Sequence, residues 1–125
     1  MKIAAVAVSA TELSRAVAFY ELLGFRFPSV EADMKHIEAD GDVRLMIDEA
    51  AFLAELHGEE PRPGNTAGFA ILFDDPAGVD AVASRVADAG YTVVTAPYNA
   101  PWGQRYATVA DPDGYCTDLF APLPA

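Results

Sequence analysis

Three aromatic side chains within one short segment are the strongest candidates for ligand contact. Tyr98, Trp102 and Tyr106 follow Ala96-Pro97, and proline favours a loop or a sheet edge over a central strand. Rings at the mouth of a binding site suit a flat or amphipathic ligand. The alternative is that Trp102 and Tyr106 close the apolar core.

Other chemistries find weaker support. Asp111 and Asp113 resemble paired catalytic carboxylates, but Asp-Pro-Asp-Gly is typical of a turn made by Asx hydrogen bonds and a glycine. Ser9 has no evident base partner, and Cys116 is expected to be a small core hydrophobe rather than a nucleophile. The glycines stand at helix ends and turns, so no phosphate-binding loop is predicted.

The two histidines are the remaining candidates for a metal. His36 falls in a predicted strand, where alternation can direct its side chain into a binding cleft. We expect it to be structural or to contact a ligand rather than to bind metal. His57 precedes Gly-Glu-Glu and is expected at the surface.

Composition limits the class of protein. The chain has 125 residues, of which 52% are hydrophobic and 22% charged, as expected for one globular domain. Its net charge of −11, with only eight Lys and Arg, argues against a nucleic-acid partner. The same charge favours cationic ligands, although solubility alone also explains it.

The amino-terminal apolar run, residues 3–8, is far shorter than the roughly 20 residues that span a bilayer. We therefore expect no membrane span and no signal peptide. A single cysteine cannot form an internal disulfide, so the fold does not need an oxidising compartment. These features predict a cytoplasmic protein.

The first half of the chain reads β-α-β-β-β. A strand over 3–8 precedes an amphipathic helix, for which Ser9 and Glu12 have capping-box spacing and Gly24 suits a carboxyl-terminal cap. A hairpin follows over 35–47, around Asp40-Gly41. Residues 49–57 are predicted to add a short surface helix.

The second half repeats this order. A strand over 67–73, a helix that starts at Asp75-Pro76 and ends at Gly90, a strand over 91–95 and a hairpin over 105–120 are predicted. The sequence therefore predicts an α+β fold with one βαβββ module at about 1–58, a Pro-rich joint at about 59–66 and a second module at about 67–125. Two packed modules and one duplicated sheet both remain open.

Two segments, 16–25 (AVAFYELLGF) and 102–114 (WGQRYATVADPDG), carry a family resemblance. The chain resembles the vicinal oxygen chelate superfamily of glyoxalase I, extradiol dioxygenases, fosfomycin-resistance proteins and bleomycin-resistance proteins. The resemblance implies a single domain in which two βαβββ modules form a half-open β cup with the helices packed outside. It also implies a divalent metal held by facing strands.

The metal positions of that family fall here on Ala5, Met46, Gly68 and Asp118. Only Asp118 has a side chain that suits Mg, Mn or Fe, and one carboxylate does not hold such an ion. Shifting the alignment by one residue brings Leu45 or Ile47 into play, and neither is a ligand. We therefore expect no metal and no other cofactor.

Pro101-Trp102-Gly103 beside Asp-Pro-x-Gly-x-Cys, and residues 43–47, are most similar to the bleomycin-resistance branch. This implies a homodimer that sequesters a cationic antibiotic-like ligand in an acidic, aromatic cleft without metal. The predicted ligand site comprises Tyr98, Trp102 and Tyr106, with Met34, Met46 and Asp118 nearby.

Two alternatives remain. One is a lyase, isomerase or dioxygenase of the same superfamily, in which Asp118 acts as general base or a metal is recruited through His36. The other is a partner-binding module with a vestigial cup. Whether the protein is an enzyme is left open, with binding preferred over catalysis.

Overall fold

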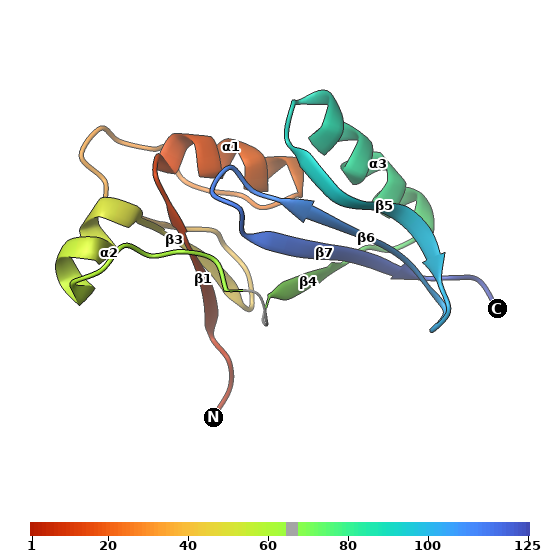
Figure 1. The fold of residues 1–125 in the computed structure, drawn as a ribbon. Helices are drawn as coiled ribbons and strands as arrows, with labels where there is room; N and C mark the ends of the chain where they lie inside the picture. The colour runs from red at the N-terminus through yellow and green to blue at the C-terminus, as the bar shows by residue number, and fades with distance from the viewer. Residues whose placement is uncertain (65–67) are drawn as a thin grey trace. The chain divides into compact units, whose positions relative to one another are not determined.

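The structure, a computed structural model, describes residues 1–64 and 68–125 (Figure 1). It divides into two compact units, residues 1–64 and residues 65–125. The first unit combines a β-sheet with two helices and the second combines a β-sheet with one helix, so the predicted α+β class is confirmed. No helix in the described part of the chain is both long and apolar enough to cross a membrane.

The first unit contains a three-stranded sheet. Its elements are β1 (Ala5–Ala10), α1 (Leu13–Leu22), β2 (His36–Glu38), β3 (Arg44–Glu49) and α2 (Ala50–His57). The strand order is β1-β3-β2, with β3 parallel to β1 and antiparallel to β2. The predicted surface helix is confirmed as α2.

Alternation along β3 separates the two faces of this sheet. Leu45 and Ile47 are fully buried, as are Phe19 and Tyr20 of α1, which contacts β3. Arg44, Met46 and Asp48 must therefore lie on the opposite face.

Two predictions for this unit are wrong. It has one strand fewer than the β-α-β-β-β pattern, because no strand forms between α1 and β2. The Phe25 ring instead packs edge-on against Tyr20, at 6.0 Å between ring centroids. The capping box also fails, since Ser9 belongs to β1 and the N-cap residue Glu12 makes no side-chain cap hydrogen bond.

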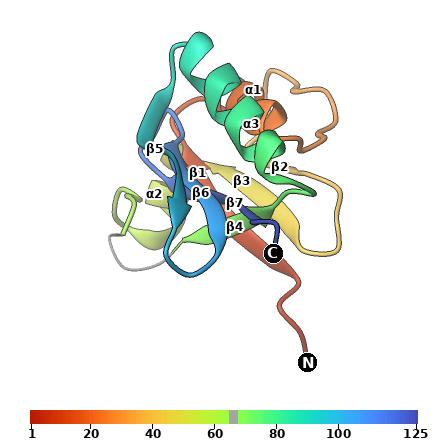
Figure 2. The same ribbon diagram turned by 90° about the vertical axis from the view of Figure 1, so that its right-hand side faces the viewer.

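The second unit has the predicted strand, helix and three strands (Figure 2). They are β4 (Phe69–Leu72), α3 (Pro76–Asp88), β5 (Thr92–Ala100), β6 (Gln104–Ala110) and β7 (Cys116–Pro122). The strand order is β4-β7-β6-β5, with β4 parallel to β7 and the other pairs antiparallel. The predicted strand start at residue 67 and the end of the predicted joint, residues 65–66, lie outside the described residues.

The sequence signals at the two ends of α3 act as predicted. The Asp75 carboxylate accepts a 2.9 Å hydrogen bond from the Gly78 amide, and Pro76 opens the helix. Gly90 follows the helix with φ +87°, a conformation that glycine adopts without steric cost.

α3 covers one face of this sheet (Figure 1). Its buried side chains include Val79, Val82 and Val86, and the buried sheet residues alternate along β6 and β7 as Ala107, Val109, Thr117, Leu119 and Ala121. The residues between them therefore lie on the face opposite α3, and this face carries the candidate site.

Candidate ligand-binding site on the second sheet

The sheet register brings aromatic residues from three strands together on the face opposite α3. Tyr106 of β6 has Tyr98 of β5 as its Cα partner on one side and Phe120 of β7 on the other. Trp102 stands in the turn between β5 and β6. Neighbours across strands interact directly, so the register itself builds the cluster.

The turn fixes the backbone of Trp102. The Gly103 amide donates a 3.0 Å hydrogen bond to the Ala100 carbonyl, and Gly103 has φ +88°. A turn followed by a left-handed glycine is a common three-residue hairpin loop. The Gly103 carbonyl accepts a further 3.0 Å hydrogen bond from the Leu123 amide, which ties the chain after β7 to this turn.

The rings pack edge to face. Ring centroids of Trp102 and Tyr106 lie 5.4 Å apart at 82°, and Tyr98 lies 6.4 Å from each of the other two. Phe120 stacks on the other side of Tyr106 at 6.4 Å. Such pairs stabilise one another by about 0.5–1.5 kcal/mol beyond their buried area.

Exposure separates this cluster from the core. Trp102 remains 58% exposed and Tyr98 37%, whereas Tyr106 is half-buried. The alternative in which Trp102 closes the core is therefore wrong. A large aromatic side chain that packs on its neighbours yet stays exposed is characteristic of a contact surface.

Asp118 of β7 is the acidic group of this face. Its carboxylate accepts a 2.6 Å hydrogen bond from the Tyr106 hydroxyl and a 2.7 Å hydrogen bond from Thr108. The bond to Asp118, together with burial, raises the pKa of Tyr106 to about 12. Tyr106 therefore stays a hydrogen-bond donor throughout the physiological pH range.

No cation neutralises Asp118 among the residues that the structure describes. Residues 65–125 contain only two basic side chains, Arg85 and Arg105. Arg85 belongs to α3, and Arg105 pairs with Asp80 of the same helix at 2.9 Å. The face opposite α3 therefore has a negative charge that favours neutral or cationic ligands.

The structure adds residues that the sequence did not single out. Thr108 and Phe120 join the site through the alternation of β6 and β7. Gln104 also joins, since its Oε1 accepts a 2.9 Å hydrogen bond from the Trp102 indole N–H. Period-two spacing from Tyr106 was the signal that identifies Gln104 and Thr108.

Met34 and Met46 belong to the first unit. Met34 lines an open hollow of about 420 Å³ beside the start of α1, together with Leu13 and Glu49. Met46 lies instead on the β3 face that carries Arg44 and Asp48. Their part in a ligand site remains a prediction.

His36 lies in a charged network on that same face of the first sheet. Its Nδ1 lies 2.6 Å from Asp48 and its Nε2 lies 2.8 Å from Glu38, so the protonated imidazole donates to both carboxylates, while Arg44 pairs with Glu38 at 3.3 Å. The hydrogen bonds to Asp48 and then Glu38 raise the pKa of His36, and the bond to His36 lowers the pKa of Glu38. Sequence reasoning singled out His36 but neither carboxylate, because their proximity depends on the β2–β3 register.

The family's metal does not fit the side chains that this chain provides. The residue paired with Met46 on the neighbouring strand is Ala7, and the residue paired with Asp118 is Ala70. If these paired positions, rather than Ala5 and Gly68, are taken as the metal positions, they still provide only alanine. Within residues 1–64 and 68–125, no group of three or more His, Cys, Asp and Glu side chains is arranged to hold a metal ion. Divalent ions of this class need several such ligands.

Three minor expectations are resolved. Cys116 is exposed at the start of β7, so its prediction as a core residue is wrong. Asp111 makes the predicted turn, since its carboxylate accepts from the amides of Asp113 and Tyr115 at 2.9 Å each. His57 is exposed, as predicted.

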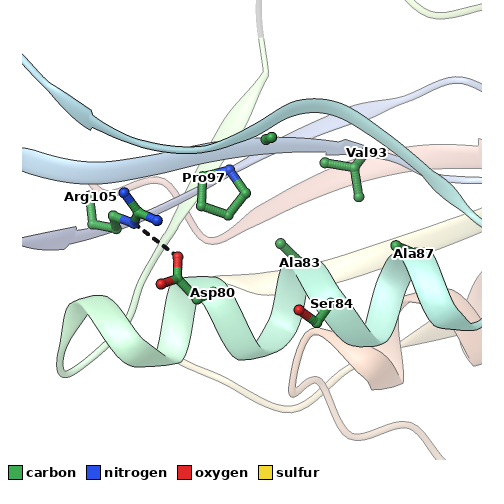
Figure 3. A pocket seen from close by; sticks show the side chains of 8 residues that line it. Asp80, Ala83, Ser84, Ala87, Val93, Pro97 and Arg105 are labelled. Carbon is green, nitrogen blue, oxygen red and sulfur yellow. Dashed lines mark hydrogen bonds and ion pairs between the residues drawn. The ribbon is translucent and has the colours of Figure 1, made fainter.

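The second unit has a hollow between α3 and β5 (Figure 3). It measures about 410 Å³ and is floored mainly by small side chains. Arg105 closes one end, donating from Nε to Asp80 and from Nη1 to Asn99 at 3.1 Å. The Arg105 and Asp80 charges are paired with each other, so the aromatic face is the stronger candidate site.

Comparison with known proteins agrees with this architecture. A glyoxalase/bleomycin resistance protein/dioxygenase family enzyme from Burkholderia phytofirmans PsJN superposes with a TM-score of 0.82 at 19% identity, over 98% of this chain and all (100%) of that chain. TnmS3, an antibiotic binding protein from Streptomyces sp. CB03234, superposes with a TM-score of 0.68 at 25% identity, over 98% and 96%. The uncharacterized protein Mb0911c of Mycobacterium bovis is 49% identical over 45 residues, which span 36% of this chain and 30% of that protein.

A family-level match is also found for the sequence itself. A family model covers residues 2–118, which include every strand and helix except the last residues of β7. On this basis, the chain belongs to the Glyoxalase/Bleomycin resistance protein/Dioxygenase superfamily.

Proposed function

We propose that this protein binds a small aromatic cation on the face of the second sheet opposite α3, without a metal. The observation that carries the proposal is an exposed aromatic cluster beside a carboxylate that no cation neutralises among the described residues. Rings supply a large contact area at low cost in conformational entropy, and a cation adds attraction to both the ring faces and Asp118.

Charge decides between classes of ligand. The face includes the Asp118 carboxylate, and both basic side chains of residues 65–125 are on α3 or paired with it. An anionic ligand would place two negative charges close together, whereas a cation would relieve the charge of Asp118. A positive or at least uncharged ligand is therefore favoured.

Similarity to TnmS3 supports a binding role, because that protein is an antibiotic binding protein of the same fold. By this analogy the ligand is antibiotic-like. The resemblance to the bleomycin-resistance branch supports a homodimer that sequesters the ligand, and the single cysteine is compatible with the cytoplasm. Sedimentation at several protein concentrations tests the dimer, and a purely monomeric species would remove that part of the proposal.

Binding is tested with three probes of similar shape and different charge: 1-methylquinolinium, 1-methylnaphthalene and 1-naphthoate. We expect affinity to fall in that order by calorimetry. Trp102→Ala should weaken binding of the cation by about 2 kcal/mol, the cost typical of a central aromatic anchor. Leu56→Ala is the control, since Leu56 is an exposed apolar side chain of the first unit.

An unchanged dissociation constant in Trp102→Ala would reject Trp102 as the anchor. Equal binding of all three probes would reject the role of Asp118. The enzymatic alternative makes a different prediction, namely turnover of an enolisable substrate that collapses in Asp118→Asn. Both carboxylate oxygens of Asp118 already accept hydroxyl hydrogen bonds, which favours a binding role over that of a general base.

A further inference from the structure

On the aromatic face, the side-chain amide of Gln104 has a defined orientation, because it is hydrogen-bonded to the indole of Trp102. Its Oε1 lies 2.9 Å from Nε1 of Trp102. The indole nitrogen can only donate a hydrogen bond, so the amide oxygen, and not the amide nitrogen, must face it. The NH₂ group of Gln104 is thereby directed away from the indole.

The amide NH₂ of Gln104 has no hydrogen-bond partner among the described residues. The side chain is only half-buried, and it shares the β6 face with Tyr106 and Thr108. It thus presents two N–H donors beside the exposed Trp102 ring.

We propose that Gln104 determines ligand specificity by donating an amide hydrogen bond to an acceptor on the ligand that stacks against Trp102. This inference rests on the proposed function and narrows its ligand to an aromatic cation that also has a carbonyl or similar acceptor. The Trp102–Gln104 hydrogen bond has a second effect, because it holds an exposed indole in one orientation before the ligand arrives. Such pre-organisation reduces the entropy cost of binding.

The test uses two probes of equal charge and similar shape, (4-acetylphenyl)trimethylammonium and (4-isopropylphenyl)trimethylammonium. They differ in the carbonyl oxygen. Trp102 is the only tryptophan of the chain, so its fluorescence reports binding at this site alone. We expect the wild type to bind the acetyl probe about fivefold more tightly, the effect of one ordinary hydrogen bond.

Two substitutions distinguish hydrogen-bond donation to the ligand from positioning of the Trp102 indole. Gln104→Glu keeps an oxygen that accepts from the indole but has no N–H to donate, so the preference for the acetyl probe should vanish while Trp102 fluorescence anisotropy stays unchanged. Gln104→Ala removes both interactions, so the preference should vanish and the anisotropy should fall. The added charge of Gln104→Glu attracts the ammonium group of both probes alike, and any repulsion of the acetyl oxygen also acts against the preference, so the affinity ratio remains the readout.

The outcomes are distinguishable. Wild-type protein that binds both probes equally would overturn the role of Gln104 and leave the proposed function standing, and so would a preference retained in Gln104→Glu. Binding of neither probe would reject the proposed function for aromatic cations and this inference with it. Far-UV circular dichroism of both variants confirms that they are folded.

Discussion

The hydroxyl of Tyr106 donates a 2.6 Å hydrogen bond to the carboxylate of Asp118, across the β6–β7 pair of the second sheet. This contact joins the aromatic part of the candidate site to the carboxylate on the same face. It also keeps the phenol neutral, because ionisation would place two negative charges in contact.

Removing the carboxylate of Asp118 should therefore lower the pKa of Tyr106 toward that of an ordinary tyrosine. Tyr106 has a pKa of about 12, against a usual value of 10.0. Asp118→Asn should bring this pKa back toward 10 in a tyrosinate absorbance titration. Because the folded pKa is the higher one, the bond stabilises the fold fully below about pH 10 and its contribution disappears as the pH rises to about 12.

Tyr106→Phe is the control for that titration, since it removes the late step and leaves the other four tyrosines. A late step that persists in Tyr106→Phe would assign it to another tyrosine. An unchanged titration in Asp118→Asn would contradict the role of the carboxylate.

Metal titration should show no specific site. Ala5, Met46 and Gly68 offer no hard ligand, and Asp118 alone does not coordinate a divalent ion tightly. After chelator treatment, calorimetry with Mn, Ni, Fe(II) and Zn should detect no stoichiometric binding, and the melting temperature should not change. Metal bound at a ratio of one with micromolar affinity would overturn the metal-free proposal and lead to glyoxalase and dioxygenase assays.

The His36 network should contribute to stability at acidic rather than alkaline pH. Its pKa is raised above the usual 6.5 by Asp48 and Glu38, so the stabilisation is complete below about pH 6.5 and is lost as the pH rises through the folded pKa. His36→Gln should lower the free energy of unfolding more at about pH 6 than at about pH 9. The side chain is 40% exposed, so the difference should stay within about 0.2–1 kcal/mol.

Chemical denaturation of both proteins at the two pH values measures this difference. His57→Gln, which changes an exposed histidine outside the network, is the matched control. A penalty for His36→Gln that grows with pH would have the wrong sign for a protonated bridge.

Thr117 should be replaceable with a gain in stability. Its hydroxyl is fully buried under α3, and Oγ1 has no hydrogen-bond partner in the described part of the chain. Thr117→Val keeps the shape and removes the unpaired polar group, so the free energy of unfolding should rise by about 1 kcal/mol. Thr92→Val, at an exposed position of β5, should stay within about 0.5 kcal/mol. A loss of stability in Thr117→Val would reveal a partner for that hydroxyl.

Local signals predicted the second unit well. Asp75-Pro76 and Gly90 mark the start and the end of α3, and alternation along β6 and β7 separates buried from exposed residues. These signals act through the nearest few residues, so the sequence contains them in full. The aromatic members of the candidate site, Tyr98, Trp102 and Tyr106, are singled out by their closeness in sequence after Ala96-Pro97.

The failures have a different cause. No strand formed after Gly24, because Phe25 packs on Tyr20 and a local pattern does not record that tertiary contact. The partners of His36 come from a neighbouring strand, and sequence spacing alone does not fix a register. Exposure of Cys116 likewise depends on which face of β7 meets α3.

The residues on the two faces of β6 have different roles. Gln104, Tyr106 and Thr108 lie on the proposed binding face, while Arg105, Ala107 and Val109 face α3. A combinatorial library at the first three positions should therefore yield mostly folded proteins with altered ligand preference. Under the proposed function, the strand is a starting point for engineering new binding specificities, since the residues of one face can change while those that pack against α3 are kept.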